Sequence, residues 1–90
     1  MPLTRDDIKV GRVYSAKREK VYGFMEPLIG DRQVLWMSQD KERVQYDSPS
    51  VKIGQKRPVV PIDTFVRWAK EDITEEMPKG EWRNKRNEKK

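Results

Sequence analysis

Residues 32–47 read RQVLWMSQDKERVQYD and give the clearest structural signal in the chain. The run Val-Leu-Trp-Met predicts a strand over residues 32–38, and Val44 and Tyr46 alternate with polar neighbours over residues 43–47. The polar residues 39–42 lie between these runs, so the stretch predicts a β-hairpin. Both faces of residues 32–38 are apolar, which indicates a central strand or a face used by a partner. Composition places Trp36 in the core, because a small domain buries most of its aromatic rings.

The segments on either side predict further short elements. Residues 4–7 have capping-box spacing and predict one helical turn, and residues 12–18 predict a strand. Residues 19–31 contain three turn-forming residues and are interpreted as a loop whose apolar side chains partly pack down. Residues 57–60 predict a short strand that is limited by Pro58 and Pro61, which places it at a sheet edge.

A helix is predicted over residues 62–72. Ile62, Phe65, Val66, Ala69 and Ile73 form one apolar stripe at helical spacing. We therefore expect the stripe, with Phe65 and Val66 at its centre, to pack on the sheet. The fold class that follows is α+β: a small, strongly bent antiparallel sheet with a C-terminal capping helix.

Residues 8–14, Ile-Lys-Val-Gly-Arg-Val-Tyr, resemble the first strand of small SH3-like barrels, including Tudor and KOW modules. Residues 34–36 and 44–47 resemble segments of small bacterial and phage proteins of uncharacterised function. The resemblance implies that the bent sheet is an SH3-like barrel.

The chain has 90 residues, a length that limits it to a single domain, and its net charge is +5. Residues 79–90 hold six basic and two acidic side chains, so most of the net charge lies there. We expect a folded domain over residues 1–78 and a flexible basic tail over residues 79–90. The nearly neutral body means that the basic isoelectric point alone does not predict a polyanion partner.

Several classes of site are excluded by composition. The chain has no cysteine and no histidine, so disulfides, thiolate or imidazole metal sites and Ser-His-Asp triads are impossible. Adjacent carboxylates such as Glu75 and Glu76 are expected on solvated surfaces, and no phosphate-binding glycine loop is present. We therefore expect no enzyme, no catalytic residue, no cofactor and no metal. A secreted domain this small would usually need disulfides, so the lack of cysteine predicts a cytoplasmic protein. The residues at the N-terminus do not resemble a signal peptide and no long apolar run is present, so we expect no membrane partner.

The residues that carry a functional hypothesis are aromatic and basic. Single-strand nucleic-acid binders stack bases on aromatic rings and track phosphates with cations, and such residues lie along the predicted strands and the tail. The candidate nucleic-acid-binding residues are Tyr14, Lys17, Arg18, Arg32, Arg43, Tyr46, Arg83, Lys85 and Arg86.

Two other interpretations stay open. A protein-interaction adaptor would use the Trp36 face of the sheet or an open strand edge. The tail is either a solubilising end or a polyanion-binding arm, and Trp82 within it either docks on the body or inserts into a partner. The oligomeric state is left open by the sequence.

Overall fold

The computed structural model describes residues 2–23, 25–52, 54–78 and 82–85. Within these ranges one five-stranded antiparallel sheet has the strand order β6-β5-β4-β1-β7, and β2 pairs with β3 in a second, two-stranded sheet. The elements are η1 (Arg5–Asp7), β1 (Val13–Ala16), β2 (Val21–Tyr22), β3 (Leu28–Ile29), β4 (Arg32–Met37), β5 (Arg43–Asp47), β6 (Val59–Pro61), α1 (Ile62–Trp68), β7 (Ala69–Asp72) and η2 (Thr74–Glu76).

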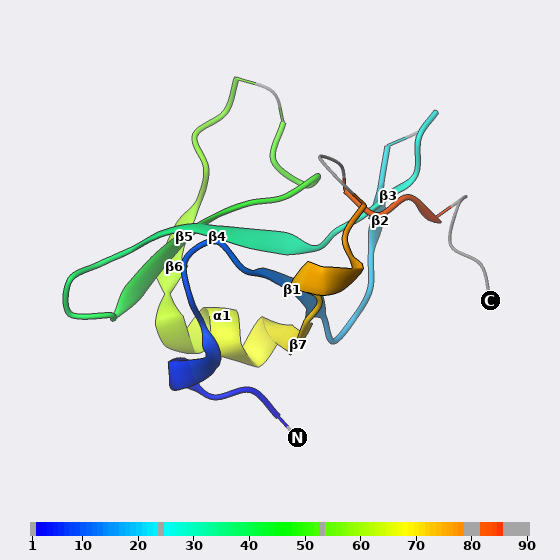
Figure 1. Ribbon diagram of the computed structural model, residues 1–90. Helices are drawn as coiled ribbons and strands as arrows, with labels where there is room; N and C mark the ends of the chain where they lie inside the picture. The colour runs from blue at the N-terminus through cyan, green and yellow to red at the C-terminus, as the bar shows by residue number, and fades with distance from the viewer. Residues whose placement is uncertain (1, 24, 53, 79–81, 86–90) are drawn as a thin grey trace.

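The predicted α+β class is confirmed, and so are the hairpin of β4 and β5 and the edge position of β6. The large sheet is not closed into a barrel, because β6 and β7 are its two edges. Helix α1 follows β6 and precedes β7 without an intervening loop, and it lies beneath the sheet in Figure 1. We call the side of the sheet that carries α1 the inner face and the opposite side the outer face.

The core lies between α1 and the inner face. Phe65 is fully buried at its centre, as the stripe predicted, and Val66 is half-buried. The Phe65 ring meets Tyr14 edge-on at 5.6 Å between centroids, and it meets Tyr46 at 6.0 Å and Trp68 at 5.3 Å. Burial of these rings is the main stabilising contribution available to so short a chain.

Helix α1 ends at Trp68, four residues before the predicted end. Residues Ala69–Asp72 instead form β7, which pairs with β1 through Ala16 and Ala69 and through Tyr14 and Asp72. The change to strand satisfies the backbone groups of β1 that would otherwise be left at an open edge. Ala69 is still fully buried, as the helical stripe required, although it reaches the core from a strand.

Trp36 is 47% exposed, so its predicted place in the core is wrong. The pairing register of β4 and β5 shifts between Val34 and Trp36: Val34 lies opposite Tyr46, and Trp36 lies opposite Gln45. One extra residue, Leu35, is accommodated as a β-bulge, and the alternation of side chains restarts after it. Val34 therefore packs in the core, whereas Trp36 shares the outer face with Gln45.

Residues 19–31 are not a plain loop. They contain the β2–β3 hairpin, in which Val21 lies opposite Ile29 and Tyr22 opposite Leu28. Gly23 has a φ of +100° at the start of the connection, a conformation that suits glycine. Ile29 is buried, which confirms that part of this apolar segment packs down.

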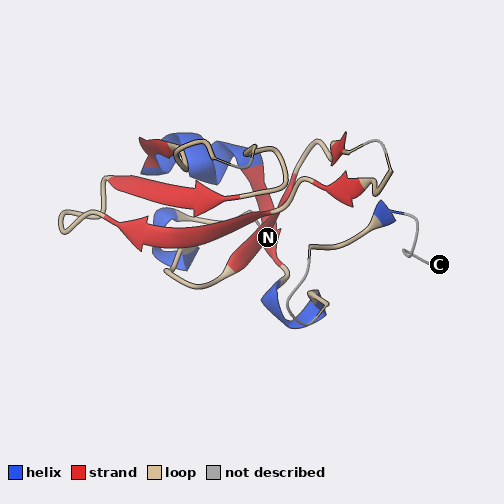
Figure 2. Cartoon of the chain, turned by 90° about the horizontal axis from the view of Figure 1, so that it is seen from above, coloured by secondary structure: helices blue, strands red, loops and turns tan. Residues whose placement is uncertain are grey.

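Part of the predicted flexible tail lies against this hairpin. The Ile29 amide donates to the Arg83 carbonyl at 2.9 Å, the Lys85 amide donates to the Pro27 carbonyl at 2.7 Å, and Asn84 forms a β-bridge with Leu28. Figures 1 and 2 both show this C-terminal segment running beside the small sheet. Residues 79–81 and 86–90 lie outside the described residues, and the domain boundary after residue 78 stays a prediction.

The N-terminal turn predicted over residues 4–7 is present as η1. The Thr4 amide donates to the Asp7 carboxylate at 2.8 Å, as the capping-box spacing implied. None of the described helices has the length and apolar character that a membrane span requires.

Candidate functional site

Arg32 is a basic residue whose guanidinium packs against two aromatic rings. It begins β4 on the inner face, where it lies opposite Tyr14 in the ladder. Its guanidinium carbon lies 4.2 Å from the centroid of the Tyr46 ring and 4.1 Å from the centroid of the Trp68 ring. These distances are within the range of cation–π contact, so two core-flanking rings hold the guanidinium in place.

The Arg32 guanidinium is half-buried, and burial lowers its pKa below the usual value of arginine. It remains charged at neutral pH, because arginine does not lose its proton in proteins near neutrality. Within the described residues it has no carboxylate in ion-pair distance and no hydrogen-bond acceptor. A partly desolvated cation normally has an anionic partner, so this position favours binding of an anion from outside.

A cleft of about 220 Å³ opens beside Arg32. Arg18 and Lys20, from the chain between β1 and β2, line it together with the Tyr22 and Trp68 side chains. Both Arg18 and Lys20 are exposed, and neither has an ion pair with another described residue. The cleft thus combines three cations with two aromatic side chains, which is the combination that binds a phosphate next to a stacked base.

Neither of the two predicted aromatic residues, Tyr14 and Tyr46, offers a stacking face. Tyr14 is fully buried, and its hydroxyl donates to the Asp7 carbonyl at 2.7 Å and accepts from the Lys9 amide at 2.9 Å. Tyr46 is only 7% exposed, with its ring between Phe65 and the Arg32 guanidinium. The Tyr46 ring supports the Arg32 guanidinium, whereas the Tyr14 ring packs on Phe65 in the core.

The predicted cations are distributed over several places. Arg18 and Arg32 meet at the cleft, whereas Lys17 is exposed beside it without lining it. Arg43 alternates with the buried Val44 of β5, so it points from the outer face, away from the cleft.

The tail cations that the structure describes are paired. Arg83 donates two hydrogen bonds to the fully buried Asp31, at 2.8 and 2.9 Å, and Lys85 pairs with Glu19 at 2.9 Å. Their charge is therefore partly neutralised within the fold. Arg86 lies outside the described residues.

Three basic or aromatic residues that line the cleft are absent from the predicted set: Lys20, Tyr22 and Trp68. Trp68 lies beside the apolar stripe of α1 rather than within it, which is a usable signal for a ring at the edge of a core. Tyr22 gives no such signal, because its position depends on the β2–β3 hairpin.

The outer face carries a second group of exposed side chains. Trp36, Leu35 and Val59 are 47%, 40% and 50% exposed. Trp36 and Val59 both lie opposite Gln45, on β4 and β6 respectively, so they form one row across the sheet. This row is an apolar surface that α1 leaves uncovered.

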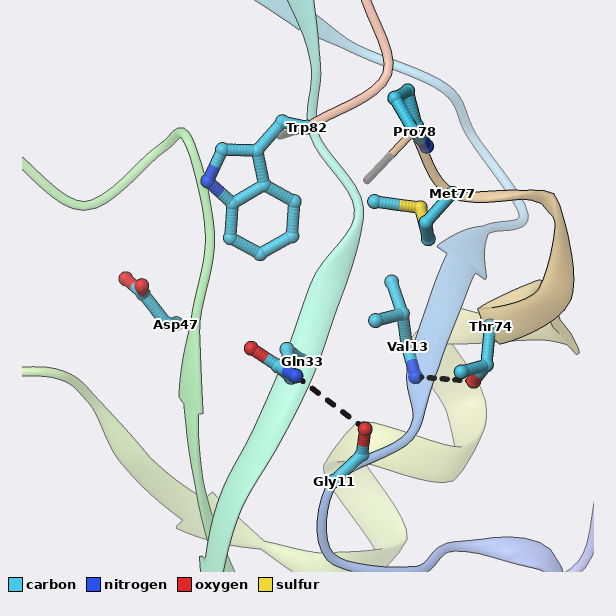
Figure 3. Close-up of a pocket in the computed structure, with 8 residues that line it drawn as sticks. All are labelled: Gly11, Val13, Gln33, Asp47, Thr74, Met77, Pro78 and Trp82. Carbon is cyan, nitrogen blue, oxygen red and sulfur yellow. Dashed lines mark hydrogen bonds between the residues drawn. The ribbon is translucent and has the colours of Figure 1, made fainter. Parts of the chain in front are cut away.

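A cavity of about 400 Å³ lies at the outer face, between the start of β4 and the segment that follows η2 (Figure 3). Val13, Met77 and Trp82 supply its apolar walls, and Gln33 and Asp47 supply polar groups from neighbouring positions of β4 and β5. The Trp82 side chain thus lies against the body, which was one of the two interpretations of this residue.

No cluster of three or more potential metal ligands among Asp and Glu occurs in the described parts of the chain. No protein-family model matches the chain, and no curated protein or solved structure matches it either.

Proposed function

We propose that this protein is a non-catalytic binding module that binds single-stranded or structured nucleic acid weakly, with a phosphate held in the Arg32 cleft. The observation that carries the proposal is the half-buried Arg32 guanidinium, which is held by Tyr46 and Trp68 and has no anionic partner within the described residues. A planar guanidinium offers several donors to phosphate oxygens, and a fixed one loses little conformational entropy on binding.

The surroundings of Arg32 favour nucleic acid over a free anion. Arg18 and Lys20 add two exposed cations along the cleft, and Tyr22 and Trp68 add aromatic surface. A free phosphate would use only the charges, whereas a nucleotide in a strand uses both charge and ring surface. The exposed Lys17 extends the basic surface along the chain from β1.

The salt dependence of oligonucleotide binding tests this proposal. Fluorescence anisotropy with a labelled single-stranded RNA and DNA decamer should show affinity that falls steeply with salt. Arg32→Gln should lower the slope of log affinity against log salt by about one unit. A melting curve of the variant separates loss of the contact from loss of the fold.

A chain that ends at Lys85 is the second arm of this test. It keeps the contacts of Arg83 and Lys85 with the body and removes the last five residues. If those five residues carry all measurable binding, the cleft is not the nucleic-acid site. If neither chain binds at low salt, nucleic acid is not the partner.

A protein-interaction adaptor is the second candidate, and the exposed row of Trp36 and Val59 on the outer face favours it. An apolar interface of this kind depends little on salt. Trp36→Ser should abolish binding to a protein partner and leave the salt slope for oligonucleotides unchanged, which separates the two candidates.

A relation to SH3-like barrels and a cytoplasmic location belong to the same proposal. The relation is supported by residues 8–14 leading into β1 and by an antiparallel sheet in which β1 lies between β4 and the last strand, β7.

A further inference from the structure

The cavity at the outer face, defined by Val13, Gln33, Asp47, Met77 and Trp82, lies apart from the Arg32 cleft. Gln33 follows Arg32 in β4, so the two side chains leave the sheet on opposite faces. In Figure 3 the Trp82 indole lies above Gln33, with Asp47 on one side and Met77 and Val13 on the other. A volume of about 400 Å³ lies in the range of small-molecule sites.

The charged group among the residues that line this cavity is the Asp47 carboxylate, which accepts hydrogen bonds, and Gln33 and Thr74 add an amide and a hydroxyl. The Ser48 amide donates a hydrogen bond to Asp47 Oδ1 at 2.9 Å, and Arg57 Nε forms an ion pair with the same oxygen at 3.4 Å. The Gly11 carbonyl at the cavity floor accepts a long hydrogen bond of 3.4 Å from Gln33 Nε2. No lysine or arginine lines the cavity within the described residues, so it does not suit a phosphate. It suits a ligand that presents N–H donors.

The Trp82 indole offers an aromatic surface for stacking, so the ligand must also have a flat face. Aromatic rings of this kind bind nucleobases by stacking, with little dependence on base identity. Base identity is instead read by hydrogen bonds at the base edge. An acceptor-only carboxylate next to a stacking ring therefore selects a base that presents adjacent donors.

We infer that this cavity takes a guanine base, stacked on Trp82, with the guanine N1–H and N2–H donating to the Asp47 carboxylate. Guanine is the one common base with two neighbouring N–H donors on its Watson–Crick edge; adenine, cytosine and uracil each pair a donor there with acceptors. The inference rests on the proposed function for the choice of a nucleobase. It adds a base-reading site on the face opposite the phosphate cleft.

Titration with free guanosine, followed by the indole N–H resonances of the three tryptophans, tests this inference. Guanosine has no phosphate, so its binding is independent of the Arg32 cleft. The Trp82 resonance should shift with guanosine while those of Trp36 and Trp68 stay fixed. Inosine, which lacks the 2-amino group, should bind about tenfold more weakly. Adenosine, cytidine and uridine should be weaker still.

Asp47→Asn should remove the preference for guanosine over inosine, because the amide cannot accept both donors on one edge. Arg57→Ala is the matched control: it removes the ion-pair partner of Asp47 but leaves the carboxylate, so the preference should remain. Equal shifts of Trp82 with all nucleosides, or a guanosine shift confined to Trp36 or Trp68, would overturn the inference. So would the absence of any shift at millimolar guanosine. Salt-sensitive oligonucleotide binding that survives such a failure would leave the cleft proposal standing.

Discussion

Tyr14 shows how one side chain that looks like a binding residue is committed to the fold. Its ring is fully buried against Phe65, and its hydroxyl bonds the Asp7 carbonyl and the Lys9 amide. Burial raises the pKa of this hydroxyl, although the hydrogen bond from the Lys9 amide acts in the opposite direction. The residue ties the segment after η1 to the core rather than offering a face to a ligand.

Tyr14→Phe should lower the free energy of unfolding by about 1–3 kcal/mol, because two backbone groups lose their partner. Oligonucleotide affinity should stay unchanged. Urea denaturation and anisotropy measure the two effects. A variant with normal stability and lost affinity would show that the hydroxyl contacts the ligand.

Phe65→Ala should cost about 3–5 kcal/mol, which is enough to unfold many domains of this size. Phe65 touches the rings of Tyr14, Tyr46 and Trp68, so its removal leaves a cavity at the meeting point of sheet and helix. Circular dichroism at increasing urea concentration measures the loss. A stable, unchanged variant would contradict the packing of α1 on the sheet.

Periodicity predicted Phe65 correctly and Trp36 wrongly, for a physical reason. The stripe of α1 is local, so sequence alone places Phe65 on the buried side. The bulge at Leu35 depends on the register of β4 against β5, and it reverses the face of Trp36. A single inserted residue of this kind leaves no periodic signal.

At the scale of elements, residues 82–85 form a short segment that packs along the β2–β3 hairpin. The pair of Arg83 with the fully buried Asp31 is its anchor, with N–O distances of 2.8 and 2.9 Å. Breaking a buried pair leaves an uncompensated charge. A flexible tail would have predicted that truncation at residue 79 leaves the melting temperature unchanged, and these contacts predict a decrease.

Arg83→Ala should therefore lower the free energy of unfolding by about 3–5 kcal/mol. Lys85→Ala is the control, because its pair with Glu19 is exposed and should contribute less than about 1 kcal/mol. Thermal melting of both variants measures the difference. Equal melting temperatures for Arg83→Ala and the unchanged chain would show that residues 82–85 are not part of the fold.

Asp72, the last residue of β7, predicts that the stability of the fold depends on pH. Burial of Asp72 acts to raise its pKa, but hydrogen bonds from Arg12 at 2.8 Å and from Thr74 at 2.6 and 2.9 Å outweigh burial and lower it. A lowered pKa stabilises the fold at pH values above the unfolded value of about 3.9, and this contribution is lost as the pH falls through the folded value.

The melting temperature should thus fall between about pH 5 and pH 2, and Asp72→Asn should show a smaller fall over that range. Glu26→Gln, at an exposed position, is the control and should follow the unchanged chain. An acid transition that is the same in Asp72→Asn would assign the effect to other carboxylates.

β7 itself is an element that sequence reasoning could not separate from α1. Ala69 and Ile73 suit a buried helical stripe and are buried in the structure, but Ala69 is in a strand and Ile73 follows one. Pairing with β1 decides the conformation, and that contact joins segments more than fifty residues apart. Local propensity carries no information about such a contact.

At the scale of the whole molecule, the positions of the charged side chains are more informative than the net charge. The sequence showed a nearly neutral body over residues 1–78. In the structure, the carboxylates near η1 and β7 pair with Arg5 and Arg12, whereas Arg18, Lys20 and Arg32 gather at one cleft without a carboxylate partner in the described residues. The net charge could not reveal this separation, because it depends on which side chains the fold brings together.

The most direct test of the cleft proposal compares two double variants of equal charge. Arg18→Gln/Lys20→Gln removes the exposed cations of the cleft, and Lys9→Gln/Lys41→Gln removes two exposed cations from the other end of the sheet. The measurement is the slope of log affinity against log salt for a single-stranded RNA decamer. The proposal predicts that the cleft variant loses about two units of slope while the control keeps the original slope. Equal slopes for the two variants would contradict a phosphate site at Arg32.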